Sequence, residues 1–467
     1  MSTREILAGI LSGRIMILDG AMGSMIQTYL KDHGKALVRC NDLLTLSTPD
    51  VISSIHEAYL DAGADIIETC SLNATSVSLD DYGLGHKARE ISRAAAAIAR
   101  KAADKFSTPD KPRFVAGSIG PTAKSAAFTQ DMDKPDKRAI SWDELEAAFY
   151  ENAKGLMEGG ADILLIETVY DSLNAKAALF AINRLCNETG DIPVMVSATV
   201  TEAGRLITGQ TPEAFCVSML HCDPLALGLN CSFGADTLKA SLEKLSFVPH
   251  PLCFYPNAGL PDDKGNYSDT PELMAKAAES CMKNGLINII GGCCGSTPAH
   301  IRAIAKIAEN YKPRIIPKSW TANPAKIILA GTRVIEHDFN YLSNPENLCT
   351  PLTFQNAIDQ GSYDEAVEIA REEADRKQIK ILAIAPDKAP DPVSVTRNLI
   401  FLAACFPDLS EFPVLIESSR WDVILAGLKC IHGRGLVKYN APPDEYKSKE
   451  NLIRSYGAVL IGASGVF

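Results

Sequence analysis

The sequence predicts an α/β fold: a (β/α)₈ TIM barrel followed by a smaller, incomplete β/α unit that is like part of a second barrel. Three observations support this fold class. Short and nearly continuous apolar runs alternate with helical segments, as expected for strands that are buried on both faces of a parallel sheet. Eight of these runs fall within residues 1–310, which is the number that closes a barrel. After a stretch rich in Pro and Lys at 311–327, the alternation resumes.

The first eight predicted strands divide residues 1–310 into the repeats of a barrel. They are expected at 14–20, 64–70, 113–120, 161–169, 193–200, 225–232, 251–259 and 288–295. Four of the helices between them begin with a Thr-Pro pair, in which threonine caps free N–H groups and proline has no N–H to leave unpaired. These pairs start at Thr48, Thr211, Thr270 and Thr297. Residues 1–310 are therefore predicted to form one domain with its active site at the carboxyl ends of the strands.

The rest of the chain is predicted to be a linker at 311–327 and a second domain at 328–467. Further strands are expected at 326–334, 379–386, 412–419, 435–440 and 458–467. Because these five strands are three fewer than a closed barrel needs, the second domain could be an incomplete barrel, an open α/β layer, or half of an assembly that a partner completes.

Composition excludes several classes of function. The net charge of -11, with 46% hydrophobic and 22% charged residues, is typical of a globular protein and argues against a nucleic-acid-binding surface. The longest apolar runs, near 398–406, have about half of the ~20 residues that span a bilayer, and the first residues show no signal-peptide pattern. We therefore expect a cytoplasmic protein without membrane or nucleic-acid partners. Its 13 cysteines should bind metal or be buried rather than form disulfides.

Two adjacent cysteines in the segment GGCCGSTP (291–298) are the most distinctive feature of the sequence. Cys293 and Cys294 lie at the carboxyl end of the eighth predicted strand, and the flanking glycines allow a tight backbone turn. A third cysteine, Cys231, lies at the matching end of the sixth predicted strand. Three thiolates leave one open position in a tetrahedral Zn²⁺ site, which is typical of catalytic zinc. Burial as small apolar side chains is the alternative, but the shared position at strand ends favours a metal site.

Other polar residues end predicted strands at the same face. Asp19, Glu68 and Glu167 are carboxylates that could bind a substrate ammonium group or hold a loop. Asn257 could supply an oxygen to the open zinc position, or simply form a turn. Cys70 lies at the mouth of the second predicted strand, and its role is left open.

Seven segments of residues 1–310 together resemble a known family. They are DGAMGSMIQ (19–27), CNDLL (40–44), GADIIET (63–69), LLIETVYDSLNAKAA (164–178), GLNCS (228–232), YPNAGLP (255–261) and GGCCGSTPAHI (291–301). This combination is similar to the homocysteine-binding module of cobalamin-dependent methionine synthase. The resemblance implies zinc ligands, a residue near the metal in the substrate-free state, and a site for the amino group of homocysteine. The residues concerned are Cys231, Cys293 and Cys294 for zinc, Asn257 near the metal, and Asp19 and Glu167 for the amino group.

Residues 328–467 resemble the first part of the folate-binding barrel that follows in that enzyme. The similar segments are GSYDEAVEIAREEA (361–374) and the stretch at 413–437. The pterin-binding pattern is altered at 330–340 and 381–387, and the family's Asp-Ser-Ser reads Glu-Ser-Ser at 417–419. The last three strands and the cobalamin-binding module are absent from the sequence. We therefore expect a partial, degenerate pterin-binding-like domain that does not bind folate by itself.

The resemblance implies a zinc-dependent homocysteine S-methyltransferase of the methionine synthase type. Homocysteine would displace Asn257, bind zinc through sulfur, and attack a methyl group presented at the barrel mouth. Methylcobalamin is the implied donor, and a separate corrinoid protein could supply it. Three alternatives stay open: a small sulfonium donor such as S-methylmethionine, a non-catalytic homocysteine-binding subunit, and a fragment of a longer synthase.

Overall fold

The structure is a computed structural model that describes residues 1–33, 39–129, 131, 134, 137–263, 265–320, 323, 326–344, 347–349, 351–377, 380–462 and 465–466. Parts of the predicted linker (321–322 and 324–325) and of two predicted strands (379, 463–464 and 467) lie outside the described residues.

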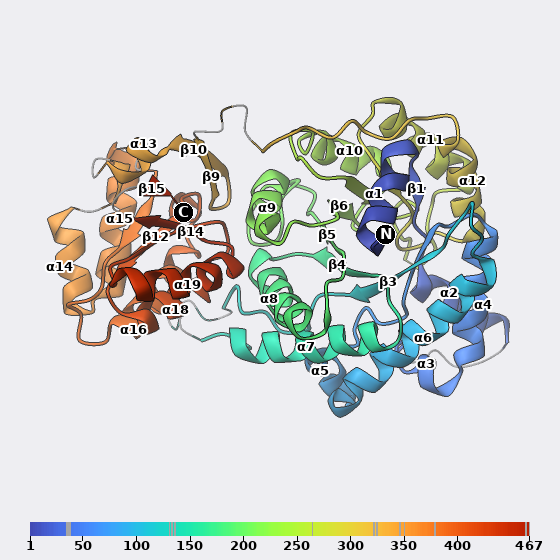
Figure 1. Cartoon of the computed structure of the whole chain (residues 1–467), viewed down its shortest axis with the longest axis horizontal. Helices are drawn as coiled ribbons and strands as arrows, with labels where there is room; N and C mark the ends of the chain where they lie inside the picture. The colour runs from blue at the N-terminus through green and yellow to red at the C-terminus, as the bar shows by residue number, and fades with distance from the viewer. Residues whose placement is uncertain are drawn as a thin grey trace.

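Eight parallel strands form the N-terminal part of the molecule, and they confirm the predicted barrel (Figure 1). They are β1 (Met16–Ile17), β2 (Ile66–Glu68), β3 (Phe114–Ile119), β4 (Ile163–Val169), β5 (Val194–Ala198), β6 (Ala226–Asn230), β7 (Leu252–Tyr255) and β8 (Ile289–Ile290). Their order in the sheet is β1-β8-β7-β6-β5-β4-β3-β2, and a parallel bridge between Leu18 and Ile66 joins its two ends. The strands therefore form a nearly closed barrel. Each lies within a predicted apolar run but is shorter, because the ends of those runs belong to the loops.

Helices surround the barrel. They are α1 (Thr3–Gly13), α2 (Met22–Asp32), α3 (Leu44–Ser47), α4 (Pro49–Asp61), α5 (Ser76–Leu79), α6 (Ala88–Phe106), α7 (Trp142–Glu158), α8 (Ser172–Thr189), α9 (Pro212–Met219), α10 (Ala235–Glu243), α11 (Pro271–Lys283) and α12 (Pro298–Ala308), with short 3₁₀ turns η1 (Asp80–Tyr82), η2 (Gly85–Lys87) and η3 (Leu220–Cys222). The predicted threonine caps are confirmed at Thr211 and Thr270, whose hydroxyls accept from the third helical N–H. The prediction is wrong at Thr48, whose side chain makes no capping bond because its backbone turns away from the extended cap conformation.

The C-terminal unit contains an open sheet and a separate hairpin. Its strands are β9 (Lys326–Ala330), β10 (Val334–Asp338), β11 (Leu382–Ile384), β12 (Val414–Ser418), β13 (Leu436–Tyr439), β14 (Val459–Gly462) and β15 (Gly465–Val466). Its helices are α13 (Phe339–Ser343), α14 (Leu352–Gln360), α15 (Tyr363–Lys377), α16 (Pro392–Ala403), α17 (Pro407–Ser410), α18 (Trp421–Leu428) and α19 (Pro443–Ser455). Strands β11 to β14 are parallel, and β15 returns antiparallel to β14.

Two strand predictions in this unit are corrected. The predicted strand at 326–334 does not join the parallel sheet; β9 pairs antiparallel with β10, which the sequence did not predict. The chain turns at Gly331, which lies so close to the backbone carbonyls of Ser410 and Glu411 that a β-carbon would approach them to 2.5 Å. The predicted strand at 458–467 is likewise two strands, β14 and β15.

The hairpin and α13 cover one face of the open sheet. Leu415 and Leu436 of the sheet belong to the same buried cluster as Leu329 of β9 and Leu342 of α13. The apolar residues on the other face belong to the large core that continues into the helices. The five-stranded sheet is thus buried on both faces, although no described residue closes it into a ring.

The two units are in close contact along α8 and α9 (Figure 1). The Nζ of Lys176 in α8 donates to the carbonyls of Ile431 at 2.8 Å and Gly433 at 3.0 Å. Part of the predicted linker is also fixed to the barrel, since the buried Arg314 side chain donates to the carbonyls of Ser246, Val248 and His250. The two sheets are therefore held in one arrangement by buried polar contacts.

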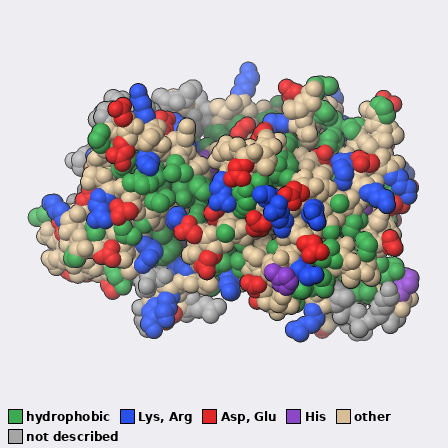
Figure 2. Space-filling view, turned by 60° about the horizontal axis from the view of Figure 1, so that its bottom comes forward, with side chains coloured by type: hydrophobic (Ala, Val, Ile, Leu, Met, Phe, Trp, Pro, Cys, Tyr) green, Lys and Arg blue, Asp and Glu red, His purple; other side chains and the backbone are tan. Residues whose placement is uncertain are grey.

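The surface shows mixed charge. On the face drawn in Figure 2, Lys and Arg side chains are interspersed with Asp and Glu side chains rather than gathered into a basic patch. In the described parts of the chain, no helix combines the length and hydrophobicity that crossing a bilayer requires.

Candidate functional site

Three cysteine sulfurs meet at the carboxyl end of the barrel. Cys231 follows β6, and Cys293 and Cys294 lie in the loop between β8 and α12. The three Sγ atoms are all within 4.8 Å of one another, and those of Cys231 and Cys294 are 3.8 Å apart. All three side chains are half-buried. The structure thus brings together the residues for which the sequence predicts a zinc site, and their role as ligands stays a prediction.

The backbone around the cysteines is strained and firmly held. Cys231 and Ser232 have φ values of 60° and 63°, in the left-handed region that non-glycine residues rarely adopt. The N–H of Cys231 donates to the Tyr255 carbonyl at 3.2 Å, and that of Cys293 donates to the Pro256 carbonyl at 2.7 Å. Such conformations cost about 1–3 kcal/mol each and persist where the surrounding structure enforces them. The fold therefore directs these thiols to one point.

The loop that carries Cys293 and Cys294 depends on glycine, as the sequence predicts. Gly295 has a φ of 80°, and a β-carbon there would lie 2.1 Å from the ring of Tyr267. Ser296 closes the turn, because its hydroxyl donates to the Cys293 carbonyl at 2.7 Å. A larger residue at position 295 would displace the tyrosine that covers the cysteines.

Asn257 lies between the two cysteine-bearing segments. Its N–H donates to the Phe233 carbonyl, and the next N–H, of Ala258, donates to the Cys294 carbonyl, both at 3.0 Å. Only 4% of Asn257 is exposed, yet its side-chain oxygen has no hydrogen-bond partner among the described residues. A buried oxygen without a partner costs about 1–3 kcal/mol. Three thiols and one unpartnered oxygen form a donor set that fits four-coordinate zinc.

Three carboxyl groups lie at the same end of the barrel: Asp19 and Glu167 are buried, and Glu68 is half-buried. Both side-chain oxygens of Asp19 accept from the Glu68 N–H at 3.1 Å, and Glu167 accepts from the Ser118 hydroxyl. The Glu68 Oε1 atom has no hydrogen-bond partner within the described parts of the chain. The charges of Glu167 and Asp19 both act on Glu68, so the three acids lie close enough to affect one another's ionisation.

Burial is the main cause of their altered acidity. It raises the pKa of Asp19 well above the ordinary value, and it raises that of Glu167 to about 7, with the charge of Cys294 adding to the effect. The pKa of Glu68 is raised by burial and then by the charges of Glu167 and Asp19. Among the described groups that shift these pKa values, none is a cation. A positively charged ligand would therefore stabilise the ionised carboxylates.

Comparison with known proteins agrees with this geometry. Residues 16–308 match the family model described as homocysteine S-methyltransferase. The chain belongs to the homocysteine S-methyltransferase family. It is similar to the homocysteine methyltransferase MmuM from Escherichia coli, whose oxidized form is 25% identical over 62% of this chain and 95% of that chain, with a TM-score of 0.51. The metallated form of MmuM is 25% identical over 64% of this chain and 98% of that chain, with a TM-score of 0.52.

Two residues of this methyltransferase that the sequence did not single out contact the cysteine sulfurs. The Tyr267 side chain forms a hydrogen bond with that of Cys294, and burial and the Cys294 charge raise the pKa of Tyr267. The Nδ2 atom of Asn230 lies 4.0 Å from the Cys293 sulfur. Asn230 directly precedes Cys231, so its position was a usable signal; Tyr267 lies in a loop without any recognisable pattern.

Cys70 is not part of the sulfur cluster. It is buried, and its thiol donates to the Asn41 carbonyl at 3.7 Å. Burial raises the pKa of Cys70 well above that of a free thiol. Its environment is that of a core cysteine.

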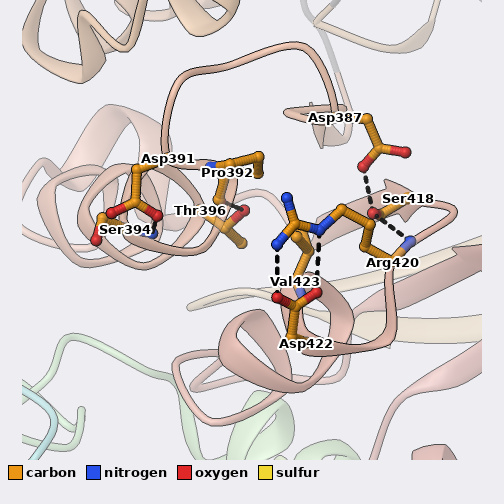
Figure 3. Close-up of polar contacts among 9 residues, drawn as sticks. All are labelled: Asp387, Asp391, Pro392, Ser394, Thr396, Ser418, Arg420, Asp422 and Val423. Atoms are coloured by element: carbon orange, nitrogen blue, oxygen red, sulfur yellow. Dashed lines mark hydrogen bonds and ion pairs between the residues drawn. The ribbon is translucent and has the colours of Figure 1, made fainter.

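The carboxyl edge of the C-terminal sheet has a different character. Asp387 follows β11, and it accepts from the Ser418 hydroxyl (Figure 3). It also accepts from the Ser419 N–H at 2.8 Å and the Ser419 hydroxyl at 2.7 Å. Burial acts to raise the pKa of Asp387, but these hydrogen bonds outweigh it and lower the pKa. Nearby, Arg420 pairs with Asp422 at 2.6 Å. The polar groups of this edge bind one another.

Proposed function

We propose that the protein is a zinc-dependent methyltransferase of the methionine synthase type that transfers a methyl group to the thiol of homocysteine and forms methionine. The observation that carries the proposal is the convergence of three cysteine sulfurs at the mouth of the barrel, where the buried carboxyl groups of Asp19 and Glu167 also lie. The family and the similarity to MmuM support homocysteine as the methyl acceptor.

The residues that would hold zinc are Cys231, Cys293 and Cys294. The unpartnered oxygen of Asn257 would complete the site until the substrate sulfur takes its place. Bound zinc would lower the pKa of the substrate thiol, which otherwise lies above neutral pH, and hold the resulting thiolate for attack. The strained backbone at Cys231 and the hydrogen bond from Cys293 N–H hold the thiols in place before substrate arrives.

The carboxylates would orient the other end of homocysteine. Asp19 and Glu167 are the proposed partners of its ammonium group, and Glu68 offers a third oxygen acceptor in the same region. Each hydrogen bond to a charged group contributes about 1.5–3 kcal/mol. Binding the ammonium group would also favour the ionised form of the acids, because no cation is among the described groups that shift their pKa values.

Apolar loops around the mouth support a protein-borne methyl donor. Leu72, Phe128, Ile207 and Leu260 are exposed, and they follow strands β2, β3, β5 and β7 respectively. All four therefore belong to loops on the side of the barrel where the sulfurs lie. A partner that covers these loops would bury their exposed apolar side chains. We infer that a separate corrinoid protein docks there and presents methylcobalamin.

Residues 328–467 are proposed to be a partial pterin-binding-like domain that does not bind folate by itself. The polar groups at the carboxyl edge of its sheet support this, because Asp387 already accepts three hydrogen bonds from its own chain. We propose that the domain serves to support the barrel through the contacts of α8 and α9.

A single assay tests the function. Purified protein is analysed for metal and then supplied with homocysteine and one of three donors: a methylated corrinoid protein, free methylcobalamin, or S-methylmethionine. Methionine formation with the corrinoid protein alone, together with bound zinc, supports the proposal. Turnover with S-methylmethionine alone would show that the donor is a small sulfonium compound and not a corrinoid protein. Binding of zinc and homocysteine without turnover on any donor would identify a non-catalytic subunit. A protein that binds neither would refute the proposal.

A further inference from the structure

One buried amide connects the two halves of the site. Asn230 is the last residue of β6, and its side chain is 0% exposed. Its Oδ1 atom accepts from the Thr168 N–H at 3.0 Å and from the Ser197 hydroxyl at 2.8 Å. Its Nδ2 atom donates to the Thr168 hydroxyl at 2.8 Å and to the Cys293 sulfur at 4.0 Å. Asn230 thus binds the end of β4, the strand β5 and the cysteine loop at once.

Its main partner, Thr168, has an unusual backbone. The φ of Thr168 is 54°, which is strained for a β-branched residue, and the pairing of β4 with β5 is irregular between Ile166 and Val169. Thr168 directly follows Glu167, so the strained backbone is adjacent to the residue that carries the carboxyl group. Asn230 is hydrogen-bonded to both the N–H and the hydroxyl of Thr168, and therefore holds this conformation in place.

The residues on the other side of Asn230 are strained as well. Cys231 and Ser232 are both in the left-handed region, so the chain changes direction immediately after the amide. Fixing Asn230 in the core therefore also fixes the point from which the Cys231 thiol projects. Two strained segments, one carrying a carboxylate and one carrying a thiol, share a single buried side chain.

We propose that Asn230 is a positioning residue that sets the separation between the sulfur-binding and ammonium-binding parts of the homocysteine site. The inference rests on the proposed function, because it concerns how the same site binds its substrate. The thiol and amino groups of homocysteine can be only a limited range of distances apart. The cysteine cluster and the carboxyl groups must therefore lie at a matching distance from each other. A displacement of about 1 Å can cost about 100-fold in rate.

The test compares two thiols that differ only in the amino group. Dissociation constants of homocysteine and 4-mercaptobutyrate are measured on the zinc-loaded protein, and the near-ultraviolet sulfur-to-cobalt charge-transfer bands are recorded on the Co²⁺-loaded protein. Three variants are needed. Asn230→Asp keeps the shape of the side chain but removes its N–H donors. Thr168→Val removes only the hydroxyl acceptor. Asn152→Asp is the matched control, because Asn152 is also 0% exposed and donates to the Ser92 hydroxyl at 2.8 Å in the helical layer.

Asn230→Asp should lower the preference for homocysteine over 4-mercaptobutyrate by about tenfold or more and shift the cobalt bands, because it disturbs both Glu167 and Cys293. Thr168→Val should lower the preference but leave the cobalt bands unchanged, since it does not contact the sulfur. Asn152→Asp should change neither.

Equal weakening of both thiols in Asn230→Asp, with unchanged cobalt bands, would overturn the inference and leave Asn230 a purely structural residue. If Asn230→Asp does not fold, an unaltered preference in Thr168→Val would overturn it. Failure of the wild-type protein to bind metal or homocysteine would instead refute the proposed function.

Discussion

The barrel sheet and the C-terminal five-stranded sheet both end in polar residues at their carboxyl edges, but these residues have different partners. At the barrel mouth, the side-chain oxygens Asn257 Oδ1 and Glu68 Oε1 are buried without a partner among the described residues. At the edge of the C-terminal sheet, Asp387 takes three hydrogen bonds from Ser418 and Ser419. The first edge therefore has buried oxygen acceptors left for a ligand. The second has used its acceptors to hold its own loops.

This difference shows that the position of polar residues at strand ends does not make a site by itself. Parallel sheets bind ligands at this edge in many proteins, yet function depends on which groups remain available there. Buried groups without partners are costly in the free protein, so a ligand that bonds to Asn257 Oδ1 and Glu68 Oε1 would recover that cost.

The largest effect should follow from removing one sulfur. Cys293→Ala should abolish zinc binding and lower methyl transfer more than about 1000-fold, because two thiols are fewer than the three protein ligands that catalytic zinc requires. Metal analysis and methionine formation on one sample measure both. The matched control is Cys405→Ala in the C-terminal unit, which removes a half-buried thiol that donates to the Phe401 carbonyl at 3.3 Å. Full transfer in Cys293→Ala, or metal loss in Cys405→Ala, would break the distinction between the two regions.

The next effect concerns the ammonium group. Glu167→Gln should weaken homocysteine binding about 10- to 100-fold at pH 8, because a charged hydrogen bond is lost. The pKa of Glu167 is raised to about 7 by burial and by Cys294, with the Ser118 hydrogen bond opposing, while Asp19 and Glu68 are the neighbouring acids. As pH falls through 7, the wild-type carboxylate takes up a proton and its advantage over the variant should disappear. Binding curves between pH 5.5 and 8.5 measure this. A constant difference would contradict it.

Much of the barrel and its sulfur cluster could be predicted from the sequence. Continuous apolar runs located all eight strands, because strands buried on both faces tolerate few polar residues. Cysteines at the ends of β6 and β8 were expected to meet, since parallel strands in a barrel all end at one face.

Other features could not be predicted, for physical reasons that concern single residues. Thr168 has a left-handed backbone conformation, which β-branched residues disfavour. The residue type at position 168 therefore gave no indication of this conformation. Tyr267 contacts Cys294 only because its loop folds back through a bridge between Pro261 and Tyr267. Strand β10 reads VIEHD, which is half polar because that strand is only partly buried. In each case, tertiary contacts override the local pattern.

A smaller effect is expected where the two regions meet. Lys176 is buried, and burial together with the charge of Arg434 lowers its pKa to about 7 from 10.5. Between these values the unfolded chain holds a proton that the folded chain does not, so stability should rise with pH, by at most about 1.4 kcal/mol per pH unit. Lys176→Met should lose this dependence. Urea denaturation at pH 7 and pH 9 measures it, with the exposed Lys105→Met as the control. Equal pH dependence in both variants would show that Lys176 stays charged in the folded state.

The smallest effect is expected at the C-terminal edge. Asp387→Asn should destabilise the protein by less than about 1 kcal/mol, because the carboxylate is exposed and water competes for its hydrogen bonds. The folded protein lowers the pKa of Asp387, so the stabilisation is present at neutral pH and is lost as pH falls below its ordinary value of 3.8. Thermal unfolding of both proteins at pH 7 and at a pH well below 3.8 measures this difference. Methionine formation should stay within about twofold of wild type, because the groups that Asp387 binds belong to its own loops. A large loss of methyl transfer in Asp387→Asn would mean that the C-terminal edge takes part in the reaction. The proposed difference between the barrel edge, which binds a ligand, and the C-terminal edge, which binds its own loops, would then be wrong.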